Sequence, residues 1–207
     1  MGYTTDFWGE LTLSKPLSKK RLNYINTFSE TRRMKRDVNK LMELYEGKHG
    51  HPNPKEKTPQ GIYGNDGEYF AYDDGYNGQK EDSSIIDYNA APGQTGYVST
   101  IDFNTRWNEN QKRMKEGKCQ PGLWCQWVVR EVDEGKQILE WDGGEKFYNY
   151  VEWLKYLINH FFEPWGVKLN GEINWRGEET GDMGIIVVKD NVVKIKVAEI
   201  TYKDEDE

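Results

Sequence analysis

Four cations lie within five consecutive residues of the sequence. They are Arg32, Arg33, Lys35 and Arg36. Guanidinium and ammonium groups bind phosphates and carboxylates through charge-assisted hydrogen bonds, and a helix expected to begin at Asp37 would add its first amides to such a site. We therefore predict an anion-binding site for a phosphate or a nucleic-acid backbone. In the alternative interpretation, these consecutive side chains point in different directions, and some of them pair with acidic neighbours.

Two glutamates on predicted strands, Glu140 and Glu172, are candidates for acid–base chemistry. Two carboxylates can act as acid and base when they lie close together and one of them is desolvated, because burial raises its pKa. An enzyme of this kind would act on a nucleotide or a sugar. Outward glutamates are commonplace on strands, so this enzyme is the alternative and not the main prediction.

Motifs of common catalytic and metal sites are missing from the sequence. It contains no Gly-x-Ser-x-Gly, no Walker loop and no Gly-x-Gly-x-x-Gly. His49 and His51 have no third ligand nearby, and the spacing between Cys119 and Cys125 does not fit a common zinc site. We therefore expect no metal and no cofactor, and the main prediction assigns no catalytic residue.

Alternation along the predicted strands places polar side chains on one face of a sheet. Side chains of a strand point to opposite faces in turn, so the apolar residues would face a helix. The opposite face would carry Trp124, Gln126, Asn170, Asn174 and Arg176. A ligand on this face would stack on the indole and form hydrogen bonds with the other four. The alternative is an ordinary solvated face of an antiparallel sheet.

One long amphipathic helix is predicted to support that sheet. Between residues 145 and 162, apolar side chains recur every three or four residues, as on a helix with one buried face. They include Phe147, Val151, Leu154, Ile158 and Phe161. Glycines precede this segment and a proline follows it, so the sequence carries helix-breaking residues at both ends.

The strands around this helix predict an α+β fold. Residues 123–132 and 137–141 form one predicted hairpin, residues 167–176 form a third strand, and residues 185–189 and 192–197 form a second hairpin. The resulting β-β-α-β-β-β order, with short connections, is typical of an antiparallel sheet with a helix on one face.

The first half of the chain is less regular. Residues 5–13 alternate as in a strand, and helices are predicted from Ser18 to about Thr31 and over residues 37–46. Residues 48–100 are rich in glycine, proline, asparagine and aspartate, which indicates loops, with short strands at 68–72 and 84–88. A polar surface helix is predicted over residues 102–117.

Length and charge predict one domain of 207 residues. Its parts are a basic strand-helix-helix part (1–57), a loop-rich part ending in the polar helix (58–117), the β-β-α-β-β-β part (118–202) and an acidic tail (203–207). The first part has a net charge of +5 and the remainder −12. This acidic balance disfavours a general nucleic-acid binder. With two cysteines, no leader and no long apolar run, we expect a cytoplasmic protein without a membrane segment.

Several motifs resemble a family of uncharacterised proteins from bacteria and their phages. They are MGYTTDF at 1–7, TRRMKR at 31–36, QPGLWCQW at 120–127, EWDGGEKFY at 140–148, and PWG with LNGE within 164–172. The resemblance spans most of the chain but transfers no activity and no catalytic residue. It implies a prokaryotic or phage setting, in which a small acidic protein would act as an accessory factor directed at a host-defence component or its nucleotide signal.

The sequence thus predicts a non-enzymatic binding protein that contacts a protein partner or a small anionic ligand. Its contact region would combine the polar sheet face with the basic run. The first alternative is the enzyme that uses Glu140 and Glu172. The second alternative is an acidic decoy that presents its Asp/Glu-rich half to a nucleic-acid-binding enzyme, through binding that weakens with salt.

Overall fold

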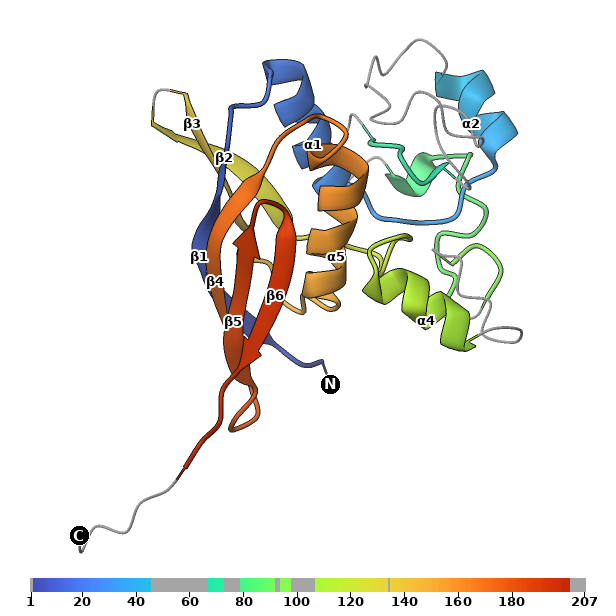
Figure 1. The fold of residues 1–207 in the computed structure, drawn as a ribbon. Helices are drawn as coiled ribbons and strands as arrows, with labels where there is room; N and C mark the ends of the chain where they lie inside the picture. Colours follow the sequence, from blue (N-terminus) through green and yellow to red (C-terminus); the bar gives the residue numbers. More distant parts are fainter. Residues whose placement is uncertain are drawn as a thin grey trace, which may run out of the picture.

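A six-stranded antiparallel sheet forms the centre of the fold (Figure 1). The computed structural model describes residues 2–45, 67–72, 79–91, 94–97, 107–133 and 135–201. In the order in which they lie in the sheet, the strands are β2 (Trp127–Asp133), β3 (Lys136–Trp141), β1 (Thr5–Leu13), β4 (Leu169–Gly177), β5 (Met183–Lys189) and β6 (Val192–Val197). The predicted α+β class with an antiparallel sheet is therefore confirmed.

Strand β1 lies in the middle of this sheet, between β3 and β4. It pairs with β4 along its whole length, from Thr5 opposite Gly177 to Leu13 opposite Leu169. The strand therefore belongs to the same sheet as the strands of the second half of the chain. Its apolar side chains alternate with polar ones, so one side of the strand faces the core and the other faces solvent.

Two helices cover the inner face of the sheet, where one long helix was expected. Helix α1 (Lys19–Glu30) begins after Ser18, whose hydroxyl accepts a hydrogen bond from Arg21 N over 3.4 Å. Helix α5 (Tyr150–Leu157) continues into a π-helical turn, η3 (Ile158–Phe162). The predicted helix over 145–162 is thus shorter at its start and shares the inner face with α1 (Figure 1).

Large aromatic side chains fill the space between the sheet and these helices. The Phe7 ring forms edge-to-face contacts with four other rings, at centroid distances of 4.8–5.8 Å. These rings belong to Trp127, Trp141, Phe147 and Tyr150. Such pairs add to the stability gained from area burial. The low apolar fraction of the sequence is therefore compatible with a dense core.

The remaining elements lie on the far side of the two helices from the sheet (Figure 1). They are α2 (Val38–Tyr45), the short 3-10 helix η2 (Gln79–Glu81) and α4 (Trp107–Lys115). The strands predicted at 68–72 and 84–88 are absent, since Gly67 begins a turn and Ile85 forms only a single bridge with Arg36. The first residues of the predicted helix 102–117 lie outside the described residues. No helix in the described part is long and apolar enough to cross a bilayer.

Candidate functional site

Arg33, in the middle of the basic run, points into the protein interior. Its guanidinium donates hydrogen bonds of 2.6 Å each to Gln120 Oε1, Phe70 O and Glu68 O. It also lies over the Phe28 ring at 4.2 Å, with 1% of the residue exposed. Burial lowers the pKa of Arg33 to about 10. This side chain holds the loop-rich part against α1 and the segment before β2.

Arg36 is buried in a similar way. It forms an ion pair with Asp82 at 3.4 Å, and both side chains are fully buried. Its guanidinium also donates to Met34 O and lies over the Phe70 ring. Arg33 and Arg36 therefore do not belong to an exposed anion site, and the predicted cluster of four cations does not form. The reason is that both guanidinium groups are engaged by protein acceptors in the interior, Arg33 by Gln120 and backbone carbonyls and Arg36 by Asp82.

Two of the first amides of α2 are bonded within the protein. The Asp37 carboxylate accepts hydrogen bonds from Asn39 N at 3.0 Å and from Lys40 N at 3.2 Å, so it caps the helix itself. Lys35 is partly buried, and its backbone carbonyl accepts a hydrogen bond from Ile86 N. The Asn39 and Lys40 amides are therefore already engaged, and an anion site at the start of α2 stays a prediction.

Arg32 is the member of the run that faces a cavity. Its guanidinium donates a hydrogen bond of 2.9 Å to Tyr88 O and lies 4.4 Å above the Tyr88 ring. Its backbone amide donates to Gln79 Oε1 over 2.8 Å, and the Gln79 side chain is fully buried. These contacts fix both ends of the side chain, so the position of the charge is set before any ligand arrives.

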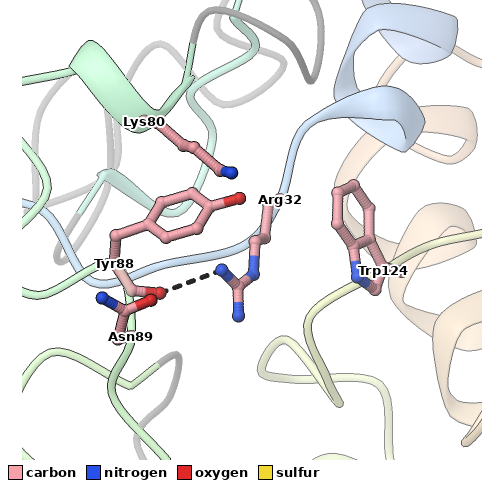
Figure 2. Close-up of a pocket in the computed structure, with 5 residues that line it drawn as sticks. All are labelled: Arg32, Lys80, Tyr88, Asn89 and Trp124. Carbon is pink, nitrogen blue, oxygen red and sulfur yellow. Dashed lines mark hydrogen bonds between the residues drawn. The ribbon is translucent and has the colours of Figure 1, made fainter.

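The cavity beside Arg32 has a volume of about 550 Å³ (Figure 2). Its lining residues are Arg32, Lys80, Tyr88, Asn89 and Trp124. Figure 2 shows the Lys80 ammonium directed toward Arg32, and Trp124 on the opposite side of Arg32 from Tyr88. Within the described residues, the lining thus combines two cations, two aromatic rings and one amide, with no carboxylate.

Four separate segments supply these side chains. Arg32 follows α1, and Lys80 belongs to η2. Tyr88 and Asn89 lie in a turn that Asp87 stabilises, because its carboxylate accepts a hydrogen bond from Asn89 N. Trp124 lies in the extended segment before β2, where Leu123 O accepts a hydrogen bond of 2.8 Å from Arg33 N. The cavity therefore depends on the buried arginine next to Arg32.

Arg32 and Trp124 were predicted from the sequence, although in two different sites. Lys80, Tyr88 and Asn89 were not predicted, since no periodicity marks the loop-rich part. The dipeptide Tyr88-Asn89 after Asp87 is an Asx-turn signal, and it is the local feature that could have indicated the turn.

The predicted ligand platform on the sheet does not form as one surface. Strand β2 begins at Trp127, so Trp124 and Gln126 precede it and do not share the face of β4. The Gln126 amide donates to Glu145 O and accepts from Trp141 Nε1, both at 3.0 Å. The Gln126 side chain thus links Trp141 to the loop that leads into α5, and both ends of its amide are hydrogen-bonded within the protein.

The three β4 residues of the platform do face away from the helices. Asn170 accepts a hydrogen bond of 2.9 Å from Asp190 N and so stabilises the turn between β5 and β6. Asn174 lies opposite Trp8 in the sheet, and Arg176 lies opposite Asp6. This face is the polar, solvated surface that alternation predicted, with the exposed Trp8 indole near its centre.

The two candidate catalytic glutamates also lie on this outer face. Glu140 is on β3 and Glu172 is on β4, so β1 separates them, and two strand spacings amount to about 10 Å. Glu140 pairs with Arg130 at 2.7 Å, and Glu172 lies 4.0 Å from Lys196. Their side chains are 29% and 54% exposed. Neither carboxylate is in the desolvated environment that the acid–base interpretation requires.

His49 and His51 lie outside the described residues, whereas the two cysteines and His160 are packed in the interior. The thiols of Cys119 and Cys125 are buried. The His160 ring stacks on Tyr156 at 4.2 Å, and its Nδ1 lies 3.2 Å from the Tyr69 hydroxyl. Within the described ranges, no three His, Cys, Asp or Glu side chains are grouped so as to hold a metal ion.

Comparison with known proteins assigns no function to this cavity. The chain was set against protein-family models, curated proteins and solved structures, and none of the three comparisons found a match. The cavity itself, with its two cations and two aromatic rings, is therefore the feature that points to a function.

Proposed function

We propose that this protein is a non-enzymatic binding protein that holds a small anionic ligand in the cavity beside Arg32. The observation that carries the proposal is the convergence of Arg32 and Lys80 on one cavity whose described lining has no carboxylate. Two cations brought together without a compensating negative charge repel each other, and a bound anion relieves that repulsion.

The fixed geometry of Arg32 supports this function. A guanidinium that already donates to Tyr88 O, on a backbone that Gln79 holds, loses little conformational entropy when it binds a ligand. Its planar donors suit the oxygen atoms of phosphate or carboxylate groups. Lys80 is exposed and adds a second positive charge that can adjust to the ligand. The arrangement is thus a rigid cation with an adaptable one beside it.

The size of the cavity favours a small molecule over a polymer. A volume of about 550 Å³ falls within the range of about 300–1,000 Å³ that is typical of small-molecule sites. Two of the four cations in the basic run are buried and engaged with protein groups, so the run offers no continuous track for a nucleic-acid backbone. The net charge of −7 also disfavours binding to a nucleic acid.

Thermal unfolding with defined anions tests the proposal. The probes are inorganic phosphate, ribose 5-phosphate, adenosine 5′-monophosphate and citrate. A ligand at a hundred times its Kd stabilises the folded state by about 2.7 kcal/mol, which raises Tm by roughly 5–10 °C for a chain of this length.

We expect at least one probe to raise Tm in the wild type and in Lys189→Gln, which removes an exposed lysine outside the cavity. The increase should be lost or sharply reduced in Lys80→Gln. The proposal fails if no probe raises Tm, or if Lys80→Gln responds as the wild type does.

A further inference from the structure

We propose that the ligand of this cavity is a mononucleotide whose base stacks on Trp124 and whose phosphate binds Arg32 and Lys80. The inference rests on the proposed function and narrows it from small anions to one chemical class. Three properties of the cavity lead to it. They are the positive charge of its described lining, the volume that a phosphate group alone would leave unfilled, and the position of the Trp124 indole.

The charge of the lining matches a single phosphate monoester. Arg32 and Lys80 contribute two positive charges, and none of the described lining residues contributes a negative one. A phosphate monoester carries about −1.5 to −2 charges at neutral pH and presents three acceptor oxygens. A single carboxylate would compensate only one of the two positive charges of Arg32 and Lys80. A triphosphate would bring more negative charge than the lining can balance.

A phosphate group alone leaves most of the cavity unfilled. A water molecule occupies about 30 Å³ in the liquid, and a phosphate group is only a few times larger. The cavity of about 550 Å³ therefore accommodates a further body attached to the phosphate. The lining beside the cations includes Trp124 and Tyr88, so this body is expected to present a flat or apolar surface.

The backbone on both sides of Trp124 is anchored, and its indole borders the cavity. Its neighbour Leu123 accepts the backbone hydrogen bond from Arg33, and Cys125 on the other side is buried. Figure 2 shows the indole separated from the Arg32 guanidinium, with the ring of Tyr88 beyond it. Proteins recognise unpaired nucleobases by stacking them on aromatic rings and guanidinium planes. The Tyr88 ring supports this guanidinium from its far side.

Asn89 supplies the hydrogen-bonding group expected at such a site. Its side chain is exposed at the cavity and carries both donor and acceptor atoms. An amide of this kind can bond to a base edge or to a ribose hydroxyl. The lining thus contains a group for each part of a mononucleotide.

Isothermal titration with paired probes tests the inference. The probes are the 5′-monophosphates of adenosine, guanosine, cytidine and uridine, together with ribose 5-phosphate and inorganic phosphate. The proteins are the full-length wild type, Trp124→Leu, and Trp8→Leu as a control that removes an exposed indole from the outer sheet face.

We expect at least one nucleotide to bind the wild type about tenfold or more tightly than ribose 5-phosphate, because stacking strengthens binding by this order. Trp124→Leu should reduce that ratio to nearly one, and Trp8→Leu should preserve it. If Trp124→Leu does not fold, the ratio of the wild-type affinities for the nucleotide and for ribose 5-phosphate tests the inference by itself.

Equal affinities for ribose 5-phosphate and all four nucleotides would overturn the inference while leaving the small-anion function in place. Nucleotide binding that Trp124→Leu does not change would also overturn it. If none of these probes binds the wild type, both the inference and the proposed function fail.

Discussion

Arg32 and Arg33 are adjacent in sequence and have opposite roles. Arg33 is enclosed and donates to three protein acceptors, whereas Arg32 borders the cavity and contacts Tyr88. A buried guanidinium is costly unless its donors are paired, and here each nitrogen atom has a partner. The internal arginine holds together the structure on which the external one depends.

Replacing Arg33 by lysine should destabilise the fold strongly. An ammonium group keeps the charge but cannot reach the three acceptors that the planar fork reaches, so at least one buried acceptor loses its partner. We expect a loss of about 2 kcal/mol or more in the free energy of unfolding, measured by urea denaturation. The control Arg176→Lys changes an exposed arginine and should stay within about 0.5 kcal/mol. Similar losses in both variants would contradict this role of Arg33.

The Cys125 thiol should make stability depend on alkaline pH. Burial raises the pKa of Cys125 to about 12, whereas an unfolded thiol ionises near about 8.5. Between these values the unfolded chain releases a proton that the folded protein keeps, so stability falls as pH rises, by about 1.4 kcal/mol per pH unit. Below this window the thiol contributes no pH dependence.

Comparison with Cys125→Ala isolates this effect. Urea denaturation of both proteins at pH 8 and pH 10, under reducing conditions, should show a steeper loss of stability in the wild type. Parallel losses in the two proteins would show that the thiol ionises equally in the folded and unfolded states.

At the residue scale, sequence reasoning succeeded where a regular element set the direction of a side chain. Asn170, Asn174 and Arg176 face outward because β4 alternates without interruption. Trp124 and Gln126 were assigned to the same face because β2 was expected to begin four residues before Trp127. The basic run had no element to orient it, so its burial depended on tertiary contacts that the sequence does not reveal.

At the element scale, two glycines allow β1 and β4 to pair closely. Gly9 has φ 107° and Gly171 has φ 145°, which are unfavourable for other residues. A Cβ atom on Gly9 would lie 2.4 Å from Glu172 O, and one on Gly171 would lie 2.4 Å from Glu10 O. These contacts involve backbone atoms of the partner strand, which cannot move without breaking the ladder.

Gly9→Ala should therefore destabilise the protein by about 3 kcal/mol or more, through the left-handed backbone and the clash together. The matched control is Gly143→Ala, where φ is 87° and no atom lies within 4 Å of the added Cβ. That variant should cost only about 1–2 kcal/mol, the backbone contribution. Thermal or urea unfolding gives both values, and equal losses would exclude the clash with β4.

The order of elements was predictable, and their arrangement was less so. The β-β-α-β-β-β order of the second half and the helices after Ser18 and Asp37 follow from periodicity and capping. The central place of β1 depends on pairing with β4, which is more than 150 residues away in sequence, and alternation does not specify a partner. The expected helix over 145–162 begins only at Tyr150, because Lys146 and Asn149 adopt positive φ angles that do not belong to a right-handed helix.

At the scale of the whole molecule, the cavity is formed by segments that are far apart in the sequence. Its lining comes from the chain after α1, from the loop-rich part and from the segment before β2. No sequence motif could have shown this combination, because its members are separated by up to 92 positions. The cavity is a property of the assembled fold.

Crystal structures of the full chain with adenosine 5′-monophosphate and with ribose 5-phosphate would show directly whether the cavity binds a phosphate. We expect a phosphate group within about 3 Å of nitrogen atoms of Arg32 and Lys80 in at least one of the two structures. A cavity that stays empty in both, or a phosphate bound instead on the outer sheet face near Arg176, would contradict this expectation.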